Sequence, residues 1–484
     1  MLKGSPYKLL ICIKLFSISG SNHPFLPKGY ILLAINYVYG RIKYGVTIIL
    51  FRGDILKIKL VDYMMGVGKS SYILDKVIDW SNEGLYEQFI YISPLLSEVG
   101  GKRKDKGKGF LKGRVQEKAD CMNFKFPVNM GKSKVDSFRD LLLKGNNISA
   151  THSVFTNLTP LDVELIRERK NVLIIDEEVQ ALDTYSDMGD QHLKVLISGG
   201  QVFVDKDSKV CWNHKDFPQS EEFLNNPNED YYSKKDIDLS KFINLCDGGY
   251  LHLVNKKIMI WEYPMVVLEA FDEVIVMTYM FEASPMASWC KINGVEVEKL
   301  IIPELEEKQL KVKENIKSLI TVVETPKIKT VENYGFSYSW WIGTGNNRDY
   351  QTKVKESLQD CVKNHLGGNI TYRDFVFTCP EKAFPKIKGV GYSRADWLYS
   401  DCKATNDYAG KKVMFYLYSK FPNIFISPFC KAKGASIDDD MYALSSMLQW
   451  LWRGCIRKGE PMKVVIASKR MRDLFKDWIN EGEV

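Results

Sequence analysis

The strongest constraint on the fold of this chain is a glycine-rich loop within residues 58–72, IKLVDYMMGVGKSSY. A short apolar run leads into the loop and a helix-like segment follows, so the stretch predicts a strand, a turn and a helix. Glycines let backbone N–H groups close on phosphate oxygens, a lysine supplies charge, and the next hydroxyl coordinates Mg²⁺. We therefore expect a nucleoside triphosphate site formed by Gly66, Val67, Gly68, Lys69, Ser70 and Ser71, with Ser70 also a ligand of Mg²⁺.

The match is to the short G-x-G-K-S core, because Tyr63 stands where the full phosphate-loop pattern has a glycine. An ordinary strand-to-helix turn is the alternative interpretation of the same residues. A second element of the site is needed to decide between them.

That second element is an acidic strand end at residues 171–178, NVLIIDEE. Residues 172–175 are all apolar and predict a fully buried strand, which Asp176 and Glu177 follow directly. Ligands of open α/β sheets bind at the carboxyl ends of the strands, where an acidic pair can hold Mg²⁺ and orient or deprotonate an attacking water. Acids also favour helix N-termini, which is the alternative. The pair following the glycine-rich loop favours nucleotide hydrolysis.

Alternating strand and helix patterns from residue 54 onward predict an α/β fold with parallel sheets. Residues 184–265 interrupt the pattern with two expected hairpins, and we interpret them as an insertion in the first domain. Helices are predicted over residues 412–421 and 437–457. The expected parts are an N-terminal extension at 1–50, which carries no motif, a first domain at 51–290 and a second domain at 291–484.

The helix predicted at 437–457 has two different faces at 100° per residue. Its apolar stripe, which must face a core, consists of Leu444, Met447, Leu448, Leu451 and Cys455. Gln449, Arg453 and Arg457 fall on the opposite face, where guanidinium groups could reach a triphosphate held by a neighbouring domain. A solvated helix face is the alternative.

Positive charge is concentrated in residues 100–114, GGKRKDKGKGFLKGR, which hold seven basic residues and one acidic residue. Such a segment can track a phosphate backbone without reading its sequence, although a solvated surface loop has the same composition. The net charge of +7 is compatible with a nucleic-acid partner but does not establish one. The candidate contacts are Lys102, Arg103, Lys104, Lys106 and Lys108.

The ten cysteines are scattered, without the spacing of a metal site or a disulfide framework, which predicts reduced thiols and a reducing cytoplasm. No run approaches the ~18 apolar residues needed to cross a membrane. We therefore expect a cytoplasmic protein with no membrane partner.

The order of these motifs resembles the superfamily 2 helicases of the DEAD/DEAH-box-like type, particularly the divergent helicase-like ATPases of bacteriophages and large DNA viruses. MGVGKSS resembles motif I, IIDEE motif II, and QWLWRGCIR at 449–457 motif VI. YISPL at 91–95 is similar to motif Ia, ATHSVF at 150–155 to the threonine-histidine segment after it, and TYMFEAS at 278–284 stands in the place of motif III. Residues 1–50 lie outside the resemblance.

The resemblance implies two RecA-like domains with ATP and Mg²⁺ in the cleft between them and nucleic acid across both. Lys69 would bind the β and γ phosphates, Ser70 and Asp176 the metal ion, and Glu177 the attacking water. The resemblance also implies that the second domain supplies Gln449, Arg453 and Arg457 as sensing and finger residues. Thr278 would couple hydrolysis to movement, and Thr151 and His152 would contact nucleic acid.

The finger is either Arg453 or Arg457, because motif VI usually has its second arginine one residue before position 457 and a glycine where Trp452 stands. The implied activity is ATP-driven translocation or unwinding in the host cytoplasm, with DNA a better expectation than RNA and with phage replication or recombination proteins as partners. Two alternatives are the motor of a DNA-packaging terminase and an ATP-dependent switch protein that does not unwind.

Overall fold

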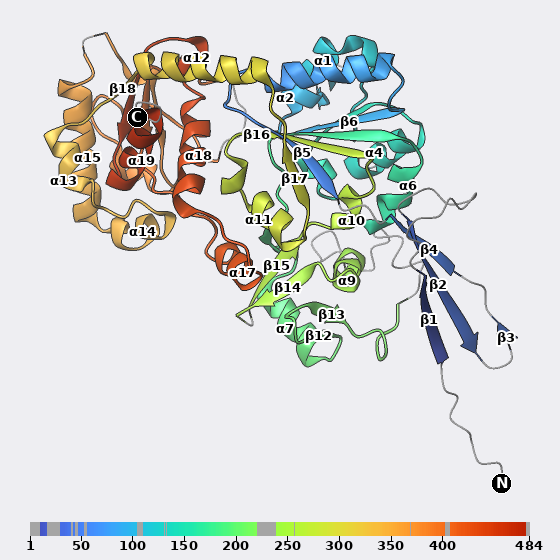
Figure 1. Cartoon of the computed structure of the whole chain (residues 1–484). Coiled ribbons are helices and arrows are strands. Elements are labelled where there is room, and N and C mark those ends of the chain that lie inside the picture. The colour runs from blue at the N-terminus through green and yellow to red at the C-terminus, as the bar shows by residue number, and fades with distance from the viewer. Residues whose placement is uncertain are drawn as a thin grey trace. The chain divides into compact units, whose positions relative to one another are not determined.

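The computed structural model describes residues 10–16, 30–39, 42–43, 47–52, 56–103, 110–129, 131, 133–219, 239–255, 257–367, 369–401 and 407–480 (Figure 1). The chain divides into two units, Met1–Leu56 and Lys57–Val484. The first unit contains an antiparallel sheet of β1 (Leu10–Phe16), β2 (Tyr30–Tyr39), β3 (Ile42–Lys43) and β4 (Thr47–Arg52), in which β2 pairs with the other three strands. Phe51 and Arg52, expected to open the next domain, instead continue the pairing of β4 with β2.

The second unit begins with a sheet of six parallel strands. Their order is β17 (Glu296–Lys299), β5 (Lys57–Asp62), β16 (Glu273–Thr278), β10 (Asn171–Asp176), β6 (Gln88–Ser93) and β9 (Ile148–Thr151). The four apolar residues of β10, 172–175, are completely buried, as expected for a parallel strand covered on both faces. Because all six strands run the same way, their carboxyl ends meet at one edge.

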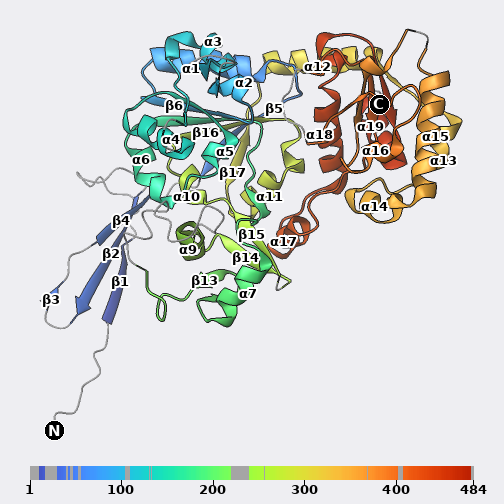
Figure 2. The ribbon, with the colours of Figure 1, turned by 180° about the vertical axis from the view of Figure 1, so that it is seen from behind.

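Helices cover both faces of this sheet (Figures 1 and 2). They are α1 (Lys69–Asn82), α2 (Leu96–Val99), α3 (Arg114–Lys118), α4 (Lys134–Leu143), α5 (His152–Phe155), α6 (Val163–Arg167), α10 (Met265–Leu268) and α11 (Pro285–Ile292). A short antiparallel pair, β7 (Lys102–Arg103) and β8 (Phe110–Leu111), separates α2 from α3.

The described chain between β10 and α10 forms small antiparallel sheets and the helices α7 and α9. Its elements are β11 (Leu182–Thr184), α7 (Asp190–Ser198), β12 (Val202–Val204), β13 (Val210–Trp212), α9 (Leu239–Asp247), β14 (Leu251–Val254) and β15 (Ile258–Glu262). Antiparallel pairing of β12 with β13 and of β14 with β15 confirms the two predicted hairpins.

A second parallel sheet follows α12 (Pro303–Leu319), in the order β18 (Ile320–Val322), β22 (Met462–Ile466), β21 (Val413–Tyr416), β19 (Phe375–Thr378) and β20 (Asp396–Trp397). Its helices are α13 (Pro326–Val331), α14 (Tyr338–Ile342), α15 (Arg348–Asn364), α16 (Phe384–Ile387), α17 (Ile426–Ala432), α18 (Asp439–Leu451) and α19 (Lys469–Asn480). The predicted α/β class with parallel sheets is therefore confirmed.

The first parallel sheet continues past residue 290, where the first domain was expected to end. β17 pairs with β5, so the first sheet extends to Lys299, and the chain enters the second sheet only after α12. The local sequence of residues 296–299, EVEK, is charged and does not reveal this pairing. β17 is an edge strand, where only one flank pairs and charged residues are tolerated.

Two predicted helices are wrong in part. Residues 413–416, expected to be helical, form the fully buried central strand β21, because VMFY fits between β19 and β22. The long helix expected to reach residue 457 ends at Leu451, and Gly454 adopts an extended conformation with ψ of −172° before a 3-10 helix at Cys455–Lys458. A Cβ on Gly454 would lie 2.5 Å from the Met462 sulfur, so close packing on β22 favours glycine at this break.

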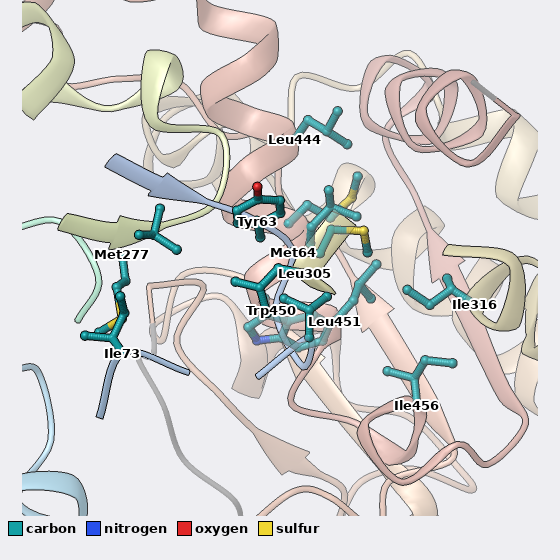
Figure 3. Close-up of a cluster of buried hydrophobic side chains, with 14 of the residues drawn as sticks. Tyr63, Met64, Ile73, Met277, Leu305, Ile316, Leu444, Trp450, Leu451 and Ile456 are labelled. Atoms are coloured by element: carbon teal, nitrogen blue, oxygen red, sulfur yellow. The ribbon is translucent and has the colours of Figure 1, made fainter. Parts of the chain in front are cut away.

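An apolar cluster joins the two parallel sheets. Figure 3 shows Tyr63 and Met64, which follow β5, near Leu305 of α12 and Trp450 and Leu451 of α18. Trp450 is completely buried. Helix α18 lies between the two sheets in both ribbon views, which brings its C-terminal end to the strand edge of the first sheet (Figures 1 and 2). Within the described chain, no helix is long and apolar enough to cross a membrane.

Candidate functional site

The glycine-rich loop joins β5 to α1 at the carboxyl edge of the first sheet. Gly66 and Gly68 have φ of 83° and 94°, in the left-handed region that favours glycine. The first N–H groups of α1 lack intrahelical acceptors, and Gly68, which precedes them, offers no side-chain cap. Exposed backbone donors at a helix N-terminus form a site for an anion such as phosphate.

Lys69 points back into this loop. Its Nζ donates hydrogen bonds to the carbonyl oxygens of Tyr63 and Met64, the latter at 3.1 Å. Burial of the ammonium group lowers the pKa of Lys69 to about 8, and the charges of Asp176 and Glu177 oppose that shift only in part. A cation that is held so close to its neutral form gains strongly from an added negative charge.

Ser70 and Asp176, the predicted metal ligands, lie side by side. Ser70 Oγ donates to Asp176 Oδ1 at 3.3 Å, although the two residues are 106 positions apart. Burial and the negative charge of Glu98 raise the pKa of Asp176, so a cation at this point would relieve an unfavourable charge. A hydroxyl and a carboxylate suit Mg²⁺, which takes few protein ligands and completes its shell with water and phosphate oxygens.

Glu177 turns sharply after β10. Its φ is 62°, an uncommon conformation for this residue type, and its N–H donates to the carbonyl of Met277 on the neighbouring strand at 2.8 Å. Its carboxylate lies 3.8 Å from a terminal nitrogen of Arg453, which is 5% exposed. Strained backbone of this kind is concentrated at functional sites.

The two parallel sheets close around a cleft with a volume of about 370 Å³. This volume lies within the range of small-molecule pockets. The cleft is lined by residues 65, 66 and 68–71 of the loop and α1, by the acidic strand end and by the C-terminal end of α18. The predicted residues on its wall are Gly66, Gly68, Lys69, Ser70, Ser71, Asp176, Glu177, Thr278, Gln449, Arg453 and Arg457.

The arginines reach the cleft in a different way from the one expected. They were placed on one face of a continuous helix, but Arg453 and Arg457 lie beyond the end of α18, in the turn and the 3-10 helix that follow. Gln449 is still within α18. Arg453 is buried against Glu177, whereas Arg457 is exposed, so the two arginines differ in environment.

The end of β16 and Tyr279, which directly follows it, connect the site to the second sheet. Thr278 donates to Glu178 Oε2 at 2.5 Å, and the OH of Tyr279 accepts from the indole of Trp478 in α19 at 2.9 Å. The side chain of Val67 is buried beneath the loop and does not line the cleft. His152 hydrogen-bonds through Nε2 to the Asp176 carbonyl oxygen at 3.0 Å, and Thr151 ends β9 nearby.

The basic segment is only partly described. Lys102 is exposed on the β7–β8 pair, and Arg103 follows it in β7. Lys104, Lys106 and Lys108 lie outside the described residues.

Sequence reasoning missed Glu98, Arg114 and Trp452 as lining residues of the cleft. Arg114 was counted only as part of the basic segment, and Glu98 carried no signal beyond its place after residues 91–95. Trp452 was noted as a departure from the motif, and its ring lies against Gly66. That contact joins residues nearly four hundred positions apart and leaves no trace in local sequence.

Comparison with known proteins gives two matches. Residues 314–479, which include the second parallel sheet, match a family described as the YonV C-terminal Rossmann-like domain. The chain is also 26% identical over 437 residues to the SPbeta prophage-derived uncharacterized protein YonV of Bacillus subtilis (strain 168). That similarity covers 87% of this chain and 98% of the prophage protein. The second sheet thus belongs to a Rossmann-like segment, consistent with its parallel strands.

Proposed function

We propose that this chain is an ATP hydrolase that translocates on nucleic acid or unwinds it, with two RecA-like domains of the superfamily 2 helicase type. The observation that carries the proposal is the cleft itself, which brings Lys69, Asp176 and Glu177 of one sheet together with Arg453 and Arg457 of the other. A nucleotide that touches both walls would stabilise a closed cleft, and its hydrolysis would release that contact.

Each side chain has a role that its position supports. Lys69 and the N-terminus of α1 would bind phosphate, and Ser70 and Asp176 would hold Mg²⁺, which supplies charge neutralisation on the phosphates. Glu177 would orient the attacking water. Arg453 contacts Glu177 in this structure. As the arginine finger, it would stabilise the negative charge that builds on the transferred phosphate. Arg457 is the second candidate for this role.

A nucleic-acid partner is supported by the basic segment at 100–114 and by the net positive charge. The prophage origin of the similar Bacillus protein supports a role in phage biology, with DNA replication or recombination in the host cytoplasm as our proposal. Thr278 would couple the site to movement, because Tyr279, which directly follows β16, contacts Trp478 of α19.

The test is the rate of ATP hydrolysis by the full chain, measured alone and with single-stranded and duplex DNA and RNA. We expect stimulation by at least one nucleic acid and loss of turnover in Lys69→Ala. Lys76→Ala is the matched control, because Lys76 lies on the same helix, its side chain is 42% exposed and it pairs with Asp79 at the surface. This control should keep the rate of the unsubstituted protein.

Hydrolysis that no nucleic acid stimulates would refute the motor and favour a switch protein. Lack of both nucleotide binding and hydrolysis would refute the enzyme altogether. The terminase alternative predicts metal-dependent DNA cleavage by the full chain. The acidic group it would draw on begins with Asp438, whose carboxylate already caps α18 by accepting from the N–H groups of Asp440 and Met441.

A further inference from the structure

The nucleotide cleft has a second cationic side chain on the wall of the first sheet, in addition to Lys69. Arg114 opens helix α3 and lines the cleft together with Glu98 of α2. The β7–β8 pair separates the two helices along the chain. Arg114 and Glu98 are nevertheless in direct contact. No motif predicts an arginine at this position.

The start of α3 is fixed tightly against the end of α2. A Cβ on Gly113 would lie 2.3 Å from the Gly100 nitrogen and 2.4 Å from the Glu98 carbonyl oxygen, so only glycine allows this approach. The buried amide of Gln116 accepts from the Gly113 N–H at 2.6 Å and donates to the Val99 carbonyl at 2.6 Å. The backbone that carries Arg114 is therefore held in place.

The guanidinium of Arg114 is oriented by Glu98. Its Nε donates to Glu98 Oε2 at 2.5 Å, and the Glu98 side chain is only 15% exposed. Within the part of the chain that the structure describes, the two terminal nitrogens of Arg114 have no hydrogen-bond acceptor. Arg114 and Glu98 line the same cleft as Asp176, the proposed metal ligand.

We propose that Arg114 is a phosphate-binding residue of the nucleotide site, supplied by the same sheet as the phosphate loop. The inference rests on the proposed ATP hydrolase and adds to it a phosphate ligand that does not depend on the second sheet. A guanidinium anchored through Nε presents two parallel N–H donors, which match two oxygens of one phosphate. Arg453 and Arg457 contribute from the other sheet, so Arg114 would retain phosphate contact when the cleft opens.

The experiment measures the dissociation constants of Mg·AMP-PNP and Mg·ADP for the full chain by titration calorimetry. Arg114→Gln is compared with Arg114→Lys, which keeps the charge but loses the paired donors. Lys112→Gln is the matched control, because Lys112 lies two residues earlier, is exposed and pairs on the surface with Asp120. Urea unfolding of each variant shows whether it is folded.

We expect Arg114→Gln to weaken Mg·AMP-PNP binding by about tenfold or more, which is the scale of a charged hydrogen bond. The dissociation constant of Arg114→Lys should lie between those of the unsubstituted chain and Arg114→Gln. The control should bind like the unsubstituted chain. If the unsubstituted chain binds and hydrolyses ATP while Arg114→Gln binds equally well, the role of Arg114 is refuted and the hydrolase stands. If the unsubstituted chain binds neither nucleotide, both proposals fall.

Discussion

The ring of Trp452 lies directly against Gly66 of the phosphate loop, and this contact predicts steric coupling between the two positions. A Cβ on Gly66 would lie 2.4 Å from Cζ2 of Trp452, and the φ of Gly66 is +83°. An L-residue in this conformation costs roughly 1–2 kcal/mol, and forcing a methyl group into occupied space costs about 1–3 kcal/mol. We therefore expect Gly66→Ala to lower the free energy of unfolding by about 2–5 kcal/mol.

A double-mutant cycle separates these two contributions, because only the contact depends on the indole ring. In a Trp452→Ala background, we expect Gly66→Ala to keep only the conformational cost, which leaves a coupling free energy of about 1–3 kcal/mol. Urea unfolding of the four proteins, followed by far-ultraviolet circular dichroism, measures the cycle. Equal m values across the set would show that the unfolded states are comparable.

Gly84 provides the matched control at the other end of the same helix. Its φ is +66°, but no atom lies within 4 Å of the position that its Cβ would take. Gly84→Ala should therefore show the conformational cost alone, with no dependence on Trp452. If the Gly66 and Trp452 substitutions prove additive within about 0.5 kcal/mol, the ring does not press on the phosphate loop and our reasoning is wrong.

Two further predictions concern single groups. Burial lowers the pKa of Lys69 to about 8, and bound phosphate should raise it, because the protonated amine binds the phosphate better. The affinity for Mg·ADP should therefore be constant below pH 8 and should fall by up to about tenfold per pH unit above it. Calorimetry across pH 7–10 tests this, and a similar fall in Lys69→Gln would refute the assignment. Asp438→Ala removes the cap of α18 and should lower the free energy of unfolding in urea by about 0.5–2 kcal/mol. Asp439→Ala keeps the cap and should lower it by less. Equal losses in the two variants would contradict the capping role of Asp438.

The sequence was sufficient for the elements whose pattern is local. The strand, loop and helix around Gly66 follow from an apolar run, two glycines and a helix-forming segment within fifteen residues. The strand at β10 follows from four consecutive apolar residues, which in a parallel sheet have no solvent-facing side. The parallel sheet then places the loop and Asp176 at one edge, so their approach was predictable as well.

The sequence was insufficient where burial overrides local preference. Residues 413–416 became a strand because a place between β19 and β22 was available, and strand pairing depends on segments up to fifty residues away. The end of α18 at Leu451 was missed for a similar reason. Gly454 breaks the helix where the chain packs on Met462 of β22, and the helical wheel has no information about that neighbour.

The residues of the candidate site also fall into two groups, those that local sequence predicts and those that only packing brings together. The amino-acid sequence by itself determined the phosphate loop and the acidic pair, because each lies in one short segment whose spacing carries its chemistry. Only the tertiary structure decided that Arg453 is buried against Glu177, that Trp452 covers Gly66 and that Glu98 directs Arg114 into the cleft. These contacts join separate segments of the chain, and their geometry arises from how the sheets and helices pack together.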